Sequence, residues 1–342
     1  MTRIRIANRS IGEGEPCFII AEAGINHNGN IVLAKRLIDA AKEAGADAVK
    51  FQTHLAQHEM LSQGPTAGYV GESLFDLLKR VELSKEDHIE LKRRAIEKQV
   101  MFLSTPFSRE AVDLLEQVGV EAYKVGSGEM TNFPLLKYIA SKGKPVILST
   151  GMSSIDEIRE TVNFLKGLTG DLVILHCISS YPPKYEDLNI KFINVLQREF
   201  RIPVGFSDHS TGIYPSLAAV ALGACVIERH FTTDRNLPGP DQKASLTPAE
   251  FAEMVKGIRI VEKVLGNTRV VTPEEQEIQK MARESVVSQV DIPQGTILKR
   301  DMVWVKRPGT GIPAKDLDKV IGRKSKVHIK ANSLISWEDF SD

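Results

Sequence analysis

The chain has 342 residues, of which 42% are hydrophobic, and its 44 basic and 44 acidic residues give a formal net charge of zero. This length can form one large and one smaller domain, and the balanced charge argues against a nucleic-acid-binding protein. The apolar stretches are too short for a membrane span, and the N-terminus lacks the apolar core of a signal peptide. Cys17, Cys177 and Cys225 are odd in number, far apart and in apolar surroundings, which predicts buried, reduced thiols and a cytoplasmic protein.

Short apolar runs alternate with amphipathic helical patterns over the first 266 residues. The first run is followed by a helical pattern over residues 31–46, for which Asn30 is a suitable N-cap. Residues 53–72 are irregular, and the whole region contains eight strand–helix pairs. The predicted strands are residues 17–24, 47–52, 100–105, 122–127, 145–150, 172–177, 203–207 and 225–231.

Strands that alternate with helices at this spacing predict a parallel sheet with helical crossovers. Eight such pairs in about 265 residues match the usual size of a (β/α)8 barrel. A doubly wound open sheet is the alternative, but it would carry a glycine-rich dinucleotide turn after its first strand. The segment "AEAGINHNG" supplies no such turn. We therefore expect an α/β protein built on a (β/α)8 barrel over residues 1–266.

The pattern changes after Gly266. Residues 267–284 are polar and predict a linker helix, whereas residues 285–342 contain short β-rich runs separated by the turn signals "PQG", "RPGTG" and "KANS". A second domain of roughly sixty residues is marginal for independent stability. We expect it to pack on the barrel or on another subunit.

Polar residues gather at the ends of the predicted strands, where a barrel places its catalytic groups. Two lysines among several small hydroxyl residues favour a site for an anion such as a phosphate or a carboxylate. A solvated rim would also carry some of these residues by chance. The set comprises Glu22, Lys50, Gln52, Ser104, Thr105, Lys124, Ser127, Ser149, Thr150, His176, Ser179, Ser207, Asp208, His209, Glu228 and His230.

His209 and His230 follow adjacent strands, so the barrel places both at one rim. A single histidine is more often structural than a ligand, but two neighbours with a few oxygen ligands suit Mg²⁺ or Mn²⁺ better than a closed zinc site. Asp208 and Glu228 could orient the imidazoles or bind ligand hydroxyls, and a rim salt bridge explains Asp208 equally well. Glu22 could act as a general base, bind substrate hydroxyls or cap its loop.

Eight segments together resemble the sialic acid synthase family, and the likeness runs from residue 17 to the C-terminus. The segment "VKRPGTGI", in the C-terminal part of the chain, resembles the antifreeze-like (SAF) domain of that family. The resemblance implies a (β/α)8 barrel followed by a small SAF domain. It also implies an enzyme that condenses phosphoenolpyruvate with an N-acetylated amino sugar to a nine-carbon 2-keto acid. The segments are "FIIAEAGINHNGN", "DAVKFQTH", "FLSTPF", "YKVGSGEMTNFPLL", "ILSTGM", "GFSDHSTG", "VIERHFT" and "LPGPDQKASL".

The resemblance also implies roles for individual residues. His209 and His230 match the ligands of Mn²⁺ or Mg²⁺, and with Glu22 they form the expected catalytic set. Arg307 matches an arginine that reaches the sugar bound in the partner's barrel, which implies a domain-swapped homodimer. The positions expected to bind phosphoenolpyruvate are Lys50, Thr105, Lys124, Ser127, Ser149, Ser207 and Ser179, the last being asparagine in some members. Those expected near the sugar are Gln52, Tyr181, Glu228 and Asp241.

The acceptor sugar stays open at this stage. N-acetylmannosamine would give N-acetylneuraminate, whereas a 2,4-diacetamido-2,4,6-trideoxyhexose would give legionaminic or, as a weaker match, pseudaminic acid. Residues 54–75 fit neither branch cleanly, and Gln242 stands where many members have histidine. Two other classes compete with the synthase. One is a Schiff-base aldolase that uses Lys50 or Lys124, and the other is a surface-binding module with the barrel as scaffold.

Overall fold

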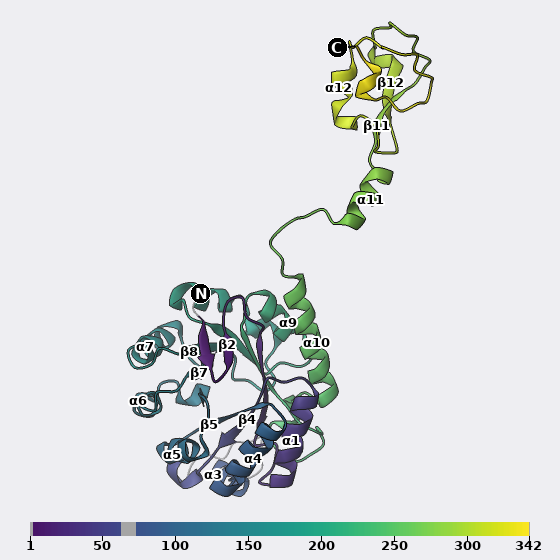
Figure 1. Ribbon diagram of the computed structural model, residues 1–342. Helices are drawn as coiled ribbons and strands as arrows, with labels where there is room; N and C mark the ends of the chain where they lie inside the picture. The colour runs from purple at the N-terminus through teal and green to yellow at the C-terminus, as the bar shows by residue number, and fades with distance from the viewer. Residues whose placement is uncertain (1–2, 63–72, 342) are drawn as a thin grey trace. The chain divides into compact units, whose positions relative to one another are not determined.

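The computed structural model describes residues 3–62 and 73–341, and the chain divides into two compact units, Met1–Leu265 and Gly266–Asp342 (Figure 1). The stretch that the sequence predicts to be irregular contains the short helix α2 (Ala56–Glu59), and its residues 63–72 lie outside the described part. No helix of the described part is both long enough and apolar enough to cross a bilayer.

The first unit is a nearly closed barrel of eight parallel strands. Neighbours hydrogen-bond in the order β5-β4-β3-β10-β9-β8-β7-β6, and the two end strands, β5 and β6, lie beside each other. The predicted (β/α)8 architecture is confirmed. The strands are β3 (Phe18–Gly24), β4 (Ala48–Thr53), β5 (Met101–Pro106), β6 (Tyr123–Val125), β7 (Val146–Ser149), β8 (Leu172–Cys177), β9 (Val204–Asp208) and β10 (Val226–His230).

The helices begin where polar side chains satisfy the free backbone N–H groups of a first turn. Asn30 Oδ1 accepts a 2.9 Å hydrogen bond from Val32 N, as the sequence predicts, and Ser84 forms a capping box with Asp87. The helices of the first unit are α1 (Ile31–Glu43), α2, α3 (Leu74–Val81), α4 (Lys85–Glu97), α5 (Arg109–Val118), α6 (Phe133–Ala140), α7 (Ile155–Lys166), α8 (Phe192–Phe200), α9 (Tyr214–Ala221) and α10 (Pro248–Val264).

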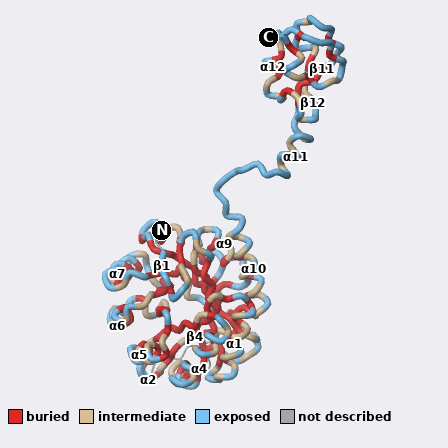
Figure 2. Tube along the Cα trace, in the orientation of Figure 1, coloured by how far each residue is buried: buried red, intermediate tan, exposed pale blue. Residues whose placement is uncertain are grey.

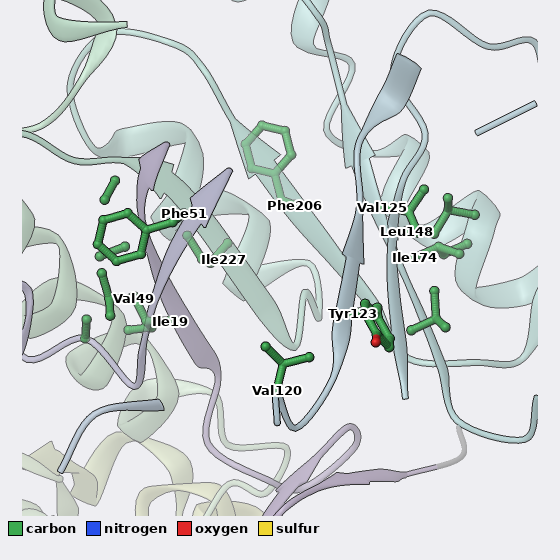
Figure 3. Packing of buried hydrophobic residues seen from close by; sticks show 14 of the residues in the cluster. Ile19, Val49, Phe51, Val120, Tyr123, Val125, Leu148, Ile174, Phe206 and Ile227 are labelled. Carbon is green, nitrogen blue, oxygen red and sulfur yellow. The ribbon is translucent and has the colours of Figure 1, made fainter. Parts of the chain in front are cut away.

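Alternate side chains of each strand point outward and pack beneath the helices. The barrel strands are largely buried, whereas the helices around them have a buried and an exposed face (Figure 2). Burying one such aliphatic side chain stabilises the fold by roughly 1.5–3 kcal/mol, so this layer holds the helices to the barrel. Figure 3 labels ten of its members: Ile19, Val49, Phe51, Val120, Tyr123, Val125, Leu148, Ile174, Phe206 and Ile227.

The remaining strand side chains point into the barrel, and those toward the N-terminal ends of the strands, its lower half, form a separate apolar cluster. The N-terminal hairpin β1 (Ile4–Ile6) and β2 (Arg9–Ile11), which the sequence analysis missed, adds three isoleucines to this cluster and closes the N-terminal mouth. The interior members contributed by the strands and the turns before them are Phe18, Ile20, Ala48, Leu103, Ala122, Ile147, Val173, Leu175 and Val226.

The second unit has its own small core, which includes Val286, Ile312 and Ile335. It consists of α11 (Pro273–Ala282), the antiparallel pair β11 (Ser285–Ser288) and β12 (Val303–Lys306), and α12 (Leu317–Val320). Isolated bridges rather than further strands tie its other segments together. All three cysteines of the chain are free thiols, but the prediction of burial is wrong for Cys225, which is partly exposed.

Candidate active site

Eight side chains form a polar layer in the upper half of the barrel interior, one from the C-terminal end of each strand. Most follow an apolar interior residue two positions earlier, so strand alternation places them on the same inner face. Each is at most 5% exposed. The polar ring, as we call this set, consists of Glu22, Lys50, Thr105, Lys124, Ser149, Cys177, Ser207 and Glu228. Sequence analysis predicted every member as a site residue except Cys177.

The two lysines of the polar ring are held by carboxylates and hydroxyls. Lys50 Nζ lies 2.7 Å from Glu22 Oε2 and donates to Thr105 Oγ1 at 3.0 Å. Lys124 Nζ donates to Ser149 Oγ at 2.7 Å. Glu228 lies between the lysines, at 3.8 Å from Lys50 Nζ and 3.6 Å from Lys124 Nζ. The ring therefore holds two lysine side chains at the centre of the barrel.

The two carboxylates of the polar ring have opposite pKa shifts. Burial and the nearby Glu228 raise the pKa of Glu22 to about 7, although Lys50 opposes the shift. Burial alone would also raise the pKa of Glu228, but Lys124 and Lys50 outweigh it and hold that pKa well below its ordinary value. Glu228 is thus a permanent negative charge, whereas Glu22 can take up or release a proton near neutral pH.

A cradle of hydroxyl groups adjoins Lys124. Gly151 follows β7, and its N–H donates to Ser127 Oγ at 3.0 Å. A Cβ on Gly151 would lie 2.7 Å from Ser127 Oγ and would collide with Ser179 Oγ, so only glycine leaves these hydroxyls accessible. Cys177 Sγ lies 3.7 Å from Ser127 Oγ. The structure thus brings the hydroxyls of Ser127 and Ser179 together beside Gly151.

His209 and His230 are neighbours, with ring centroids 5.3 Å apart, as their strand positions predict. Tyr181 stacks on His209 at 4.3 Å and meets His230 edge-on. His209 Nδ1 lies 3.1 Å from Ile178 O, which orients its ring. His230 Nδ1 is buried without a hydrogen-bond partner in the described part of the chain, and burial lowers the pKa of His230. A neutral imidazole with a free nitrogen is a suitable metal ligand.

These two histidines would supply only part of a metal coordination shell. The described residues contain no group of three or more His, Cys, Asp or Glu side chains placed to hold a metal ion. A metal at this position would therefore complete its shell with substrate or water oxygens. Such an open shell is typical of Mg²⁺ and Mn²⁺ rather than of structural zinc.

The residues predicted to bind the sugar also gather near Glu22. Gln52 Nε2 donates to Glu22 Oε1 at 3.2 Å. Gly24, with a φ of +50°, lies between Asp241 and Gln52, because a Cβ built on it would be 3.5 Å from Asp241 Oδ2 and 3.6 Å from Gln52 Nε2. Arg307 is an exposed residue of the second unit, and its role in a partner's barrel stays a prediction.

Four polar residues at the strand ends point away from the interior. Asp208 is buried against Arg229, 2.8 Å away, and accepts from the hydroxyls of Ser210 and Ser216, so the salt-bridge interpretation is confirmed. The other three are satisfied by nearby backbone carbonyls: Ser104 by Phe51 O, Thr150 by Leu175 O and His176 by Leu188 O. These residues stabilise the barrel wall and do not belong to the site.

Two groups near the site escaped the sequence analysis. Glu129 ends a 3₁₀ turn at Ser127–Glu129, and its buried Oε2 has no hydrogen-bond partner in the described part. Burial raises the pKa of Glu129 to about 7. The pair His54 and Glu59 adjoins Gln52. The sequence does offer one signal for Glu129, because in "GSGEM" it comes just after a predicted strand, where a barrel places site residues.

A separate cavity of about 1110 Å³ opens beside the barrel, lined by Met152, Tyr185, Phe192 and Tyr214 among others. Cys177 is its one lining residue from the polar ring. Because the lysines and carboxylates converge in the barrel interior instead, we place the candidate active site there.

Comparison with known proteins agrees with this geometry. Residues 37–270 match the model of the NeuB family, and residues 283–341 match that of the SAF domain. The chain belongs to the NeuB family. The resemblance inferred from the sequence motifs is therefore confirmed, together with the small C-terminal domain.

Relatives of this NeuB-family chain match it over nearly its whole length. An uncharacterized protein of Methanocaldococcus jannaschii is 45% identical over 99% of both chains. The N,N'-diacetyllegionaminic acid synthase of Legionella pneumophila is 41% identical over 96% of this chain and 95% of its own. The crystal structure of N-acetylneuraminic acid synthetase from Leptospira borgpetersenii has a TM-score of 0.75 and 38% identity, and it covers 81% of this chain and 95% of that one.

Proposed function

We propose that this protein joins phosphoenolpyruvate to an N-acetylated amino sugar and water, giving a nine-carbon 2-keto acid and phosphate. The observation that carries the proposal is the polar ring, with its two buried lysines and one carboxyl that exchanges a proton near neutral pH. The synthases of Legionella and Leptospira support it, because both are named for nine-carbon sugar acids.

The polar ring suits phosphoenolpyruvate because that substrate carries a carboxylate and a phosphate. Lys50 with Thr105 would hold one anionic group, and Lys124 with Ser149 would hold the other. The cradle of Ser127 and Ser179 supplies further donors beside Lys124. Since these groups already lie in place and exclude water, binding costs little rearrangement.

The chemistry follows from this placement. C3 of phosphoenolpyruvate attacks the aldehyde carbon of the open-chain sugar, and water adds to the cation that forms at C2. The resulting tetrahedral intermediate expels phosphate with cleavage of its C–O bond. We assign Glu22 as the base that takes the proton from this water, because its raised pKa fits that task.

A divalent metal fits His209 and His230, on the evidence of the free, buried nitrogen of His230. Bound there, Mn²⁺ or Mg²⁺ would polarise the aldehyde oxygen as a Lewis acid. The chain's own contribution is to hold both rings in place, through the Ile178 carbonyl and the stacked Tyr181.

The test is phosphate release from phosphoenolpyruvate with Mn²⁺, with and without EDTA. N-acetylmannosamine and 2,4-diacetamido-2,4,6-trideoxymannose serve as parallel acceptors, because the named relatives divide between neuraminic and legionaminic acid. We expect metal-dependent release with one of the two sugars. No release with either sugar, from protein shown to be folded, would overturn the proposal.

A Schiff-base aldolase at Lys124 is the second candidate, because burial lowers the pKa of this lysine and so favours its nucleophilic, neutral form. Lys50 is less suitable, since Glu22 and Glu228 outweigh its burial and raise its pKa. Borohydride in the presence of an aldehyde or ketone substrate would trap a covalent adduct on Lys124. An adduct, with turnover unaffected by EDTA, would favour the aldolase.

We also propose that the enzyme is a domain-swapped homodimer in which Arg307 reaches the partner's sugar site. Arg307→Ala should raise the KM of the acceptor about tenfold, the cost of one charge-assisted hydrogen bond. The measurement is complementation between this variant and Lys124→Met. A mixed dimer contains one intact barrel and one intact Arg307, so mixing should restore the normal acceptor KM. Activity equal to the sum of the separate variants would contradict the exchange.

A further inference from the structure

The segment that follows β4 places a buried histidine and a glutamate next to Gln52. His54 is only 7% exposed, and its ring stacks on Phe107 at a centroid distance of 4.2 Å and an angle of 11°. Its Nε2 lies 3.1 Å from Gln52 Oε1. Its Nδ1 lies 2.9 Å from Oε1 of Glu59, on α2. Both ring nitrogens are therefore engaged, and the ring cannot rotate without losing both contacts.

These contacts extend the polar ring by a chain of hydrogen bonds. The chain runs from Lys50 to Glu22 at 2.7 Å, then to Gln52 at 3.2 Å, then to His54, and ends at Glu59. The second carboxylate oxygen of Glu59 is buried without a hydrogen-bond partner in the described part of the chain. Among the described residues, the hydrogen bond with His54 therefore offsets most of the desolvation cost of burying the Glu59 carboxylate.

The donors and acceptors along this chain determine how the Gln52 amide is turned. When Glu22 is deprotonated, as its proposed role as a base requires, its carboxylate can only accept, so Gln52 must present its NH₂ group to Glu22 Oε1. Gln52 Oε1 then faces His54 and requires a proton on Nε2. With Nε2 protonated, Nδ1 and the Glu59 carboxylate would be two acceptors at 2.9 Å unless they share a proton. With Glu22 deprotonated, the chain is therefore consistent in only this direction.

We infer that His54 and Glu59 are positioning residues that hold the Gln52 amide with its NH₂ group toward Glu22 and the acceptor sugar. Gln52 is partly exposed, so its second N–H can donate to a ligand oxygen. This inference rests on the proposed function for the identity of that ligand, which would be a hydroxyl or an N-acetyl carbonyl of the sugar. A reversed amide would place its carbonyl against the Glu22 carboxylate, which is repulsive, and it could no longer donate to a carbonyl oxygen of the ligand.

Two variants test whether the hydrogen bonds of His54 and Glu59, rather than their packing, position Gln52. His54→Phe keeps an aromatic ring against Phe107 but loses both hydrogen bonds, and Glu59→Leu removes the group that orients the histidine. Each should raise the acceptor KM about three- to tenfold, the usual cost of one neutral hydrogen bond. The KM of phosphoenolpyruvate should stay within about twofold, because its predicted ligands do not contact this segment.

Glu59→Gln tests the direction of the chain. Its amide can donate to Nδ1 of a neutral His54, which leaves the proton on Nε2 and the Gln52 amide in place. We therefore expect this conservative variant to restore most of the acceptor affinity that Glu59→Leu loses. The matched control is His58→Phe, on the same short helix, because His58 is half exposed and lies 3.7 Å from the exposed Glu110. This control should leave both KM values unchanged.

A readout independent of turnover distinguishes failure of this inference from failure of the proposed function. In protein labelled with ¹⁵N-histidine, NMR should show a protonated Nε2 on His54 in the wild type and in Glu59→Gln. If the wild type turns over neither sugar, the proposed function fails, and the spectrum still decides the orientation. An unprotonated Nε2 would overturn the inference. So would variants that raise both KM values equally or change neither.

Discussion

The upper and lower halves of the barrel interior come from the same strands but differ in chemistry. In the lower half, apolar side chains and the β1–β2 hairpin form a cluster that gains stability from burial. Two residues further along most of these strands, buried charges, hydroxyls and one thiol form the polar ring, whose desolvation is costly. The difference separates the two tasks of the barrel, because the lower half supplies stability and the upper half can be arranged for chemistry.

The largest expected effect follows from removing a charge of the polar ring. Lys124→Met should lower kcat/KM for phosphoenolpyruvate about 10³-fold, because a buried cation aimed at the anion is lost. Steady-state phosphate release measures this change. Lys137→Met, an exposed lysine on the following helix α6, is the control and should behave as wild type. If Lys124→Met retained near-normal kcat/KM, the polar ring would not be the site of chemistry.

Glu22→Gln should lower kcat by at least about 10²-fold, because the amide cannot accept a proton from water. The variant should be less stable but still folded, because Lys50 loses its 2.7 Å ion pair with Glu22 but keeps Glu228 and Thr105 as partners. Circular dichroism and thermal unfolding check the fold, and phosphate release gives kcat. Near-normal turnover would exclude Glu22 as the base and leave it a structural partner of Lys50.

The smallest effect on activity is expected two residues below the polar ring. Ile147 is completely buried in the lower cluster and precedes Ser149 on β7. Ile147→Val should lower the free energy of unfolding by about 1 kcal/mol and leave kcat/KM within about twofold. Urea unfolding and the same kinetic assay measure both quantities. If Ile147→Val lowered kcat/KM by much more than twofold, the lower half would also contribute to catalysis, and the two halves would not have separate tasks.

The sequence predicts the barrel well because short apolar runs and amphipathic helical patterns are clearly distinct in all eight strand–helix pairs. It also places Glu22, Lys50 and Lys124 correctly at the inner rim. It cannot decide which of two adjacent polar residues at a strand end points inward. Ser104 and Asp208 therefore counted as site candidates, although strand alternation turns them outward, to Phe51 O and Arg229.

Other features depend on contacts between distant segments. His54 and Glu59 follow a strand in an irregular stretch, and only the folded chain brings the histidine against Phe107 and the end of the hydrogen-bond chain. The β1–β2 hairpin was missed because its strands have three residues each, too few for a periodic pattern. Its role becomes visible only when its isoleucines pack under the barrel.

The β1–β2 hairpin packs its isoleucines against the apolar cluster inside the barrel, so in the described structure we expect ligands to reach the polar ring from the C-terminal end of the strands. The lysines and hydroxyls of the polar ring are 3% exposed or less, whereas Tyr181, beside the two histidines, is 52% exposed. One ligand must therefore lie beneath the other, which imposes a sequence on the catalytic cycle. Under the proposed function, we expect the enol phosphate to enter first and the sugar to bind over it. A sugar that arrives first blocks the passage, so excess acceptor should act as a dead-end inhibitor that competes with phosphoenolpyruvate.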